Sequence, residues 1–89
     1  MAKVVVTLDN KVGLHARPAG AMVRVAKEFQ SAVTLTYKDK QANAKSILSV
    51  LSIGAEKGAV VTIEATGDDA EQAVEKLRQL VRDKFGEPE

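Results

Sequence analysis

The stretch SAVTLTYKDKQANAK, residues 31 to 45, begins with a clean alternation of apolar and polar residues. In an extended chain Val33, Leu35 and Tyr37 share one side. Thr34 and Thr36 share the other side. A period of two predicts a strand of a sheet that is covered on one face and open to water on the other.

The second half of the same stretch predicts a hairpin. A tight turn at Lys38-Asp39 would return the chain as a second strand from Gln41 to Ala44. Lys-Asp favours such a turn less than Asn-Gly does. Two further strands are predicted, one from the β-branched residues 4 to 8 and one from the alternating residues 59 to 65.

Two helices are predicted between these strands. Apolar residues recur at the spacing of one helix face, at Pro18, Met22, Val25, Ala26 and Phe29. A proline is tolerated in the first turn, because its missing N–H would have had no partner inside the helix. The apolar stretch ILSVLSIG, residues 47 to 54, predicts a short helix with Ser46 as its N-cap.

The clearest helix is predicted within GDDAEQAVEKLRQLVRDKFG, residues 67 to 86. Asp68 and Glu71 have the spacing of a capping box, and Gly86 and Pro88 would end the helix. Its predicted apolar face consists of Ala70, Ala73, Val74, Leu77, Leu80 and Val81.

The expected order is therefore βαββαβα in one domain, residues 1 to 89. The apolar face of the sheet and the apolar faces of the helices can bury each other if the helices form one layer and the sheet a second. This arrangement is an α+β open-faced sandwich. We expect an antiparallel sheet with the helices on one face.

Composition excludes several classes of protein. The net charge of +1 does not indicate a nucleic-acid-binding protein, and the absence of cysteine excludes disulfides, thiol chemistry and a cysteine zinc site. The five-residue apolar run near the N-terminus is too short for a signal peptide or a membrane helix. We therefore expect a cytoplasmic protein with no membrane insertion.

The only histidine of the chain stands in VGLHARPAG, residues 12 to 20. His15 would lie just before a helix, where unpartnered N–H groups and the positive end of the helix dipole form an anion site. That environment disfavours imidazolium and leaves a ring nitrogen free as a nucleophile. Arg17 is close enough to add a forked contact to a phosphoryl group on that nitrogen. The alternative is an ordinary polar residue at a helix start.

The sequence does not indicate a metal site, a hydrolytic triad or a nucleotide-binding site. One histidine and no cysteine leave only carboxylates as further metal ligands, and no serine or aspartate is placed for a hydrolytic triad. No nucleotide-binding glycine motif is present, so no cofactor is expected and other proteins must load and unload His15. Arg17, Arg24 and Lys27 fall near one helical stripe, which is either a solvated face or a surface for an acidic partner.

GLHARPAG and, some thirty residues later, KSILSVLSIG resemble the two signature stretches of the HPr family. These are the histidine-containing phosphocarriers of the bacterial sugar phosphotransferase system. The resemblance implies the sheet order 1-4-2-3, phosphorylation of His15 on Nδ1, and support of the phosphoryl group by Arg17. It also implies transfer from enzyme I to the enzyme IIA unit of sugar permeases by a carrier that is not itself an enzyme.

Ser46 has a structural explanation as a helix cap. The resemblance adds that Ser46 matches a site phosphorylated by an HPr kinase/phosphorylase. It implies that phosphorylation of this serine slows loading of the histidine and makes the protein a corepressor with a catabolite control protein. Phosphate suits an N-cap because its negative charge meets the positive helix end. Ile47, Leu48 and Leu51 would form a partly exposed apolar patch beside it.

Three other functions compete with the sugar-branch carrier. A nitrogen-branch phosphocarrier would use His15 for regulation. A small-molecule-sensing βαββαβ module would bind a metabolite without needing His15. RNA binding is disfavoured because Phe29, Tyr37 and Phe85 are the only aromatic residues, so no strand carries paired stacking residues. We expect a monomer that binds no nucleic acid.

Overall fold

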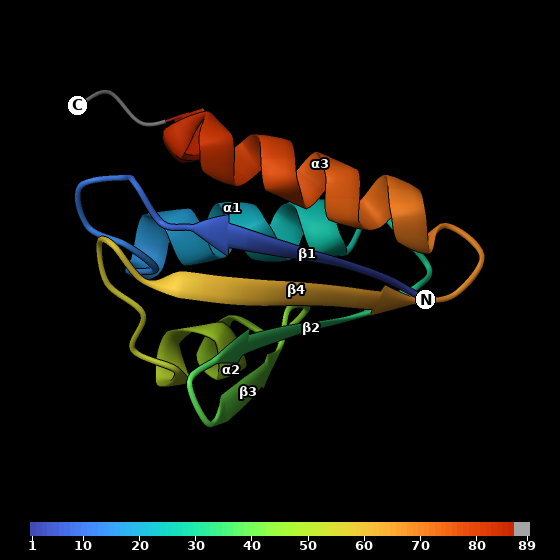
Figure 1. Ribbon diagram of the computed structural model, residues 1–89, viewed down its shortest axis with the longest axis horizontal. Coiled ribbons are helices and arrows are strands. Elements are labelled where there is room, and N and C mark those ends of the chain that lie inside the picture. Colours follow the sequence, from blue (N-terminus) through green and yellow to red (C-terminus); the bar gives the residue numbers. More distant parts are fainter. Residues whose placement is uncertain (87–89) are drawn as a thin grey trace.

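The computed structural model describes residues 1–86. Pro88, predicted to help end the last helix, lies outside the described residues. The elements, in chain order, are β1 (Ala2–Thr7), α1 (Ala16–Ala26), β2 (Ala32–Tyr37), β3 (Lys40–Asn43), α2 (Ile47–Ser52), β4 (Val60–Thr66), α3 (Ala70–Arg82) and a short 3₁₀ helix, Lys84–Gly86. The predicted order of strands and helices is confirmed (Figure 1).

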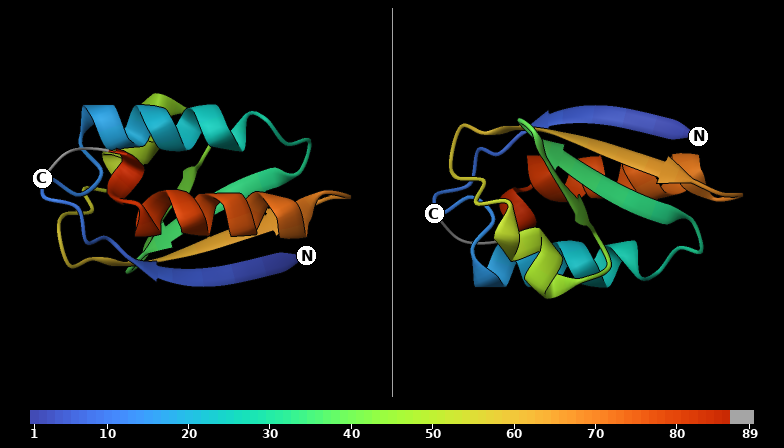
Figure 2. Two further views of the ribbon diagram at one scale, coloured as in Figure 1. Left: turned by 90° about the horizontal axis from the view of Figure 1, so that it is seen from above. Right: turned by 90° about the horizontal axis from the view of Figure 1, so that it is seen from below.

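The four strands form one antiparallel sheet in the order β1-β4-β2-β3. Figure 2 shows α1 and α3 side by side on the same face of this sheet, while the opposite face carries no helix. The alternation along β4 fits this arrangement, since Val61, Ile63 and Ala65 are buried and Val60 is exposed. The expected α+β sandwich and its strand order are confirmed.

The core lies between the sheet and the helices. Each layer contributes side chains without access to solvent, since apolar residues that face the other layer are removed from water. The largest of these apolar side chains are Leu8, Met22, Leu35, Ile53, Ile63 and Leu77.

Two details of α1 differ from the prediction. The helix ends at Ala26, and Val25 and Phe29 are only partly buried. Ala21 and Val23 are buried instead, because α1 packs against α2 on one flank and α3 on the other. A helix with neighbours on two flanks buries a wider face than the stripe expected of a surface helix.

The predicted capping box of the last helix is wrong. The N-cap of α3 is Asp69, one residue after Asp68, and its side chain makes no cap hydrogen bond. The Asp69 carboxylate instead accepts hydrogen bonds from Gln30 and Ser31 in the loop after α1. The helix ends at Arg82, before Gly86, and Leu80 on its predicted face is only partly buried.

The predicted hairpin is confirmed. Tyr37 of β2 pairs with Lys40 of β3, so Lys38 and Asp39 form the turn. Lys38 adopts a positive φ of 57°, the conformation that Asn or Gly would adopt at lower cost. No helix in residues 1–86 is long and apolar enough to cross a membrane.

Candidate functional site

His15 is the N-cap residue of α1, as the sequence predicts. Its backbone is extended, with φ −78° and ψ −174°, and its carbonyl accepts the first helical hydrogen bond, from the Ala19 N–H at 2.9 Å. Its side chain is exposed and makes no capping hydrogen bond. The imidazole is therefore not used to stabilise the helix and remains accessible for chemistry.

The first turn of α1 leaves two N–H groups close to His15. An α-helix does not satisfy the N–H groups of its first residues, which here are Ala16, Arg17 and Pro18. Pro18 has no N–H group, so the donors are those of Ala16 and Arg17. With the positive end of the helix dipole they form an anion site beside the imidazole.

The loop before His15 packs tightly against the segment that follows α2. The Leu14 N–H donates to the Ala55 carbonyl at 2.9 Å. Gly13 has a φ of 63°, and a Cβ atom there would lie 2.5 Å from the Glu56 Cα. Glycine is required at this position because any side chain would collide with the backbone of the facing loop.

A hollow of about 270 Å³ opens beside the imidazole. It brings the start of α1 together with the end of α2 and the loop after it. Its lining residues are Leu14, His15, Ala16, Leu51, Gly54, Ala55 and Glu56. The structure thus places Leu51 of the predicted patch next to His15. Arg17, exposed at the second position of α1, does not line this hollow.

The predicted basic stripe continues along α1. Arg24 lies in the last turn and Lys27 is the C-cap residue, and both are exposed. A Cβ atom built on Gly20 would lie 3.6 Å from Arg24 Nη1, so this guanidinium reaches back along the helix toward the His15 end. Cations at a helix C-terminus also stabilise the helix dipole, which gives both residues a structural role.

The short helix α2 carries the predicted cap and the predicted apolar patch. Ser46 is the N-cap, and its hydroxyl accepts a hydrogen bond from the Ser49 N–H at 3.3 Å. Leu48 is 78% exposed, while Ile47 and Leu51 are 39% and 37% exposed. The patch is therefore accessible, and it adjoins the hollow at Leu51.

Sequence reasoning missed two residues around His15, Asn10 and Glu56. Asn10 is fully buried in the loop after β1, and its side chain donates to the Gly13 carbonyl. Glu56 is exposed and is one of the residues that line the hollow. Neither residue belongs to a periodic pattern, so no local signal distinguishes it from an ordinary loop residue.

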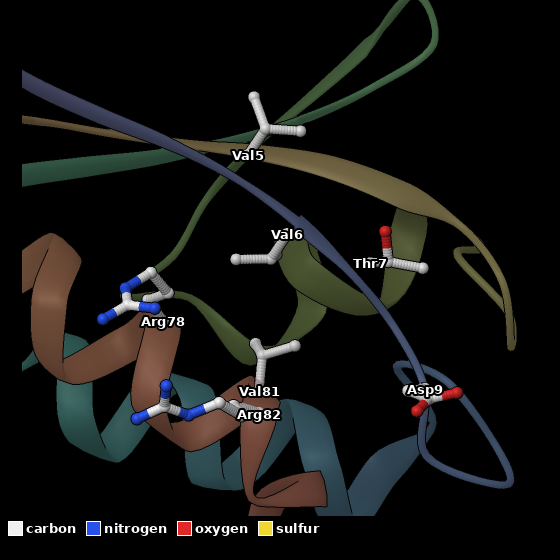
Figure 3. Close-up of a pocket in the computed structure, with 7 residues that line it drawn as sticks. All are labelled: Val5, Val6, Thr7, Asp9, Arg78, Val81 and Arg82. Carbon is white, nitrogen blue, oxygen red and sulfur yellow. The ribbon is translucent and has the colours of Figure 1, made fainter.

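A larger hollow of about 500 Å³ lies between β1 and α3 (Figure 3). It is lined by Val5, Val6, Thr7, Asp9, Arg78, Val81 and Arg82 and shares no residue with the hollow at His15. Arg78 donates two hydrogen bonds to Glu75, at 3.0 and 2.6 Å. These bonds, and then one from Gln79, lower the pKa of Glu75. This hollow contains no imidazole, so we assign the candidate site to His15.

Residues 1–86 also contain no cluster of three or more acidic, histidine or cysteine side chains that could hold a metal ion. Among the candidate groups, the His15 imidazole has the combination of exposure, a free ring and adjacent N–H donors that phosphoryl chemistry requires.

Several known proteins are similar to this chain in sequence and in fold. The family model described as "PTS HPr component phosphorylation site" matches residues 2–83. Phosphocarrier protein HPr of Mycoplasma capricolum is 41% identical over 83 residues, which are 93% of each chain. A crystal structure of HPr-C-His from Thermoanaerobacter tengcongensis superposes with a TM-score of 0.96 at 43% identity and covers 100% of both chains.

A crystal structure of an HPr dimer from the same organism has a TM-score of 0.79 and 44% identity, and the match covers 98% of this chain and 100% of that one. The family model, the sequence similarity over nearly the whole chain and the structural similarity all point to HPr proteins. The chain therefore belongs to the HPr family, the phosphocarrier proteins of the phosphotransferase system.

Proposed function

We propose that this protein accepts a phosphoryl group from phospho-enzyme I on His15 and passes it to the enzyme IIA unit of sugar permeases. The observation that carries the proposal is the exposed His15 side chain at the N-terminus of α1, free of any capping bond and next to two unpartnered N–H groups. The protein is a stoichiometric carrier, because it is itself phosphorylated and dephosphorylated once per cycle.

The transfer is a displacement at phosphorus. The lone pair of His15 Nδ1 attacks the phosphorus atom, the N–P bond to the donor imidazole breaks, and the donor nitrogen keeps that electron pair. The N–H groups of Ala16 and Arg17 then donate to the phosphoryl oxygens, and the Arg17 guanidinium adds positive charge. The same steps in reverse load the acceptor, with no net oxidation or reduction.

The docking surface that we propose combines charge and apolar contact. Arg24 and Lys27 supply positive charge along α1, while α2 supplies the exposed patch of Ile47, Leu48 and Leu51. An apolar centre with a charged rim is the usual anatomy of a specific interface. We infer that the partner proteins offer an acidic surface with an apolar centre.

Regulation at Ser46 is a further part of the proposal. The hydroxyl stands at the N-terminus of α2, beside the apolar patch, where a phosphate would meet the positive helix end. Phosphoserine there would place negative charge in the docking surface and slow loading by enzyme I. In organisms that have them, an HPr kinase/phosphorylase would add the phosphate and a catabolite control protein would bind the product.

The decisive experiment is incubation with phosphoenolpyruvate and enzyme I followed by intact-mass measurement. We expect the wild-type protein to gain one acid-labile phosphate and His15→Ala to gain none. Because the His15 side chain is exposed, the variant should keep the wild-type melting temperature. Uptake of phosphate by a folded His15→Ala protein, or no uptake by the wild type, would refute the assignment.

We also propose that residues 1 to 89 act as one unit, as a cytoplasmic monomer, because the site is built within a single copy of the chain. The alternative is a dimer, as in the crystal structure of an HPr dimer from Thermoanaerobacter tengcongensis. Sedimentation velocity at micromolar concentration separates the two states, and a dimer there would overturn the monomer assignment.

A further inference from the structure

The loop between β1 and α1 contains a buried side chain, Asn10, that has no role in the proposed transfer step. Asn10 is 0% exposed, and Ser31 is the other buried polar residue of the described chain. Burying an amide costs free energy unless its polar atoms are hydrogen-bonded, so such a residue needs a specific partner.

That partner belongs to the backbone just before His15. Asn10 Nδ2 donates to the Gly13 carbonyl at 2.8 Å. On the other side of the same peptide group, the Leu14 N–H donates to the Ala55 carbonyl at 2.9 Å. Both polar atoms of the Gly13–Leu14 peptide are therefore held, one by a buried side chain and one by the facing loop.

This peptide group has little freedom to rotate while both bonds exist. Gly13 also lies so close to the Glu56 backbone that a Cβ atom would collide with it. The Asn10 amide NH₂ group supplies the bond to the Gly13 carbonyl, while Asn10 Oδ1 has no hydrogen-bond partner among the described residues. Only a donor at this position can satisfy the Gly13 carbonyl.

We propose that Asn10 is a positioning residue for His15. By fixing the peptide group one residue upstream, it sets the direction in which the chain enters α1, and so the direction of the Ala16 and Arg17 N–H groups relative to the imidazole. Small errors in such alignment reduce the rate of a transfer step strongly. The inference rests on the proposed function of His15, and it adds a residue that does not touch the phosphoryl group.

A purely structural role makes a different prediction. If Asn10 only stabilises its loop, its loss lowers the melting temperature but leaves transfer by the fully folded protein unchanged. A positioning role lowers the transfer rate and alters the anion site under conditions in which every molecule is folded.

The test uses Asn10→Leu, which keeps the approximate shape and removes the donor, and Asn10→Ala. The control is Ile63→Val, a buried core change in β4, which lowers stability without touching the loop. Each protein is loaded by enzyme I and, separately, by phosphoramidate, a small-molecule donor whose P–N bond breaks as ammonia leaves. The readouts are the initial loading rate and the shift of the Ala16 and Arg17 amide protons on phosphorylation.

We expect both Asn10 variants to load about tenfold more slowly than wild type, with reduced amide shifts, while Ile63→Val loads at the wild-type rate. Wild-type rates and shifts in the folded Asn10 variants would overturn the positioning role. If enzyme I does not load the wild type, the proposed function fails instead. The phosphoramidate arm and the amide shifts still decide the role of Asn10.

Discussion

At the scale of single residues, Asp69 joins two loops that lie far apart in the sequence. Its carboxylate accepts hydrogen bonds from the Ser31 hydroxyl and from the backbone N–H groups of Gln30 and Ser31, both at 2.9 Å. The bond from the Ser31 hydroxyl, followed by the bond from the Gln30 N–H, lowers the pKa of Asp69. The charged carboxylate is the form that holds the two loops together.

The first prediction concerns the pH dependence of this contact. Because the pKa of Asp69 is lowered on folding, its contribution is present above the pKa of an unfolded aspartate, about 3.9, and is lost as the pH falls through the folded value. Asp69→Asn should melt at a lower temperature than wild type at pH 7, and the difference should shrink in acid. Thermal melts at pH 7 and at about pH 3 test this. Equal differences at both values would contradict it.

The second prediction concerns Glu56 at the rim of the His15 hollow. Its negative charge should repel a phosphoryl group on His15, because like charges that share a small hollow raise each other's energy. Glu56→Gln, which keeps the shape, should therefore show a longer phosphohistidine half-life than wild type. The difference should decrease at high salt. Glu71→Gln on α3 makes the same charge change and serves as the control. A half-life equal to that of the control would remove Glu56 from the site.

At the scale of elements, the N-cap residue of α2, Ser46, has a structural role as well as the regulatory role that we propose. The Ser46 hydroxyl caps the helix, and loss of such a cap costs about 0.5–2 kcal/mol. An aspartate keeps an acceptor and adds negative charge at a favourable helix end. The same substitution also places that charge in the proposed docking surface.

The third prediction separates these roles. Ser46→Ala should lose about 0.5–2 kcal/mol of unfolding free energy but load from enzyme I at nearly the wild-type rate. Ser46→Asp should be at least as stable as wild type and load slowly. Urea unfolding and loading kinetics on the same two variants provide the measurements. A loading rate that follows stability, with Ala slow and Asp fast, would leave Ser46 as a helix cap alone.

For the whole molecule the net charge is +1, while the charged residues within α1 itself are the two arginines, Arg17 and Arg24. Arg24 lies in the last turn of α1 and Lys27 is its C-cap residue, so both lie toward the end of the helix opposite His15. The fourth prediction is that Arg24→Glu or Lys27→Glu slows association with enzyme I at low salt, with the effect shrinking as salt is added. Stopped-flow loading rates measure this.

The control is Lys3→Glu, which makes the same change in net charge on β1. If the control slows loading as much as Lys27→Glu does, the effect is one of net charge and the basic stripe is not a docking surface. If neither change matters at low salt, electrostatic steering plays no part.

Features that depend on neighbours along the chain could be predicted from the amino-acid sequence. Alternation predicted β2 and β3 and the turn between them, helical spacing predicted α1 and α3, and Ser46 was identified as the cap of α2. His15 was placed before a helix for the same reason. Such features require contacts only a few residues apart, so short windows contain the information.

Contacts between segments that are distant in the sequence became known only from the three-dimensional fold. The strand order β1-β4-β2-β3 could not be derived from periodicity, because each strand shows the same alternation whichever neighbour it pairs with. The predicted capping box of Asp68 and Glu71 is wrong because Asp69 is the N-cap, and the partners of its carboxylate lie 38 and 39 residues away in the sequence. Glu56 lines the hollow at His15 because β1 and β4 pair and bring the loop after β1 beside the loop before β4, and a loop residue acquires such a position only from packing.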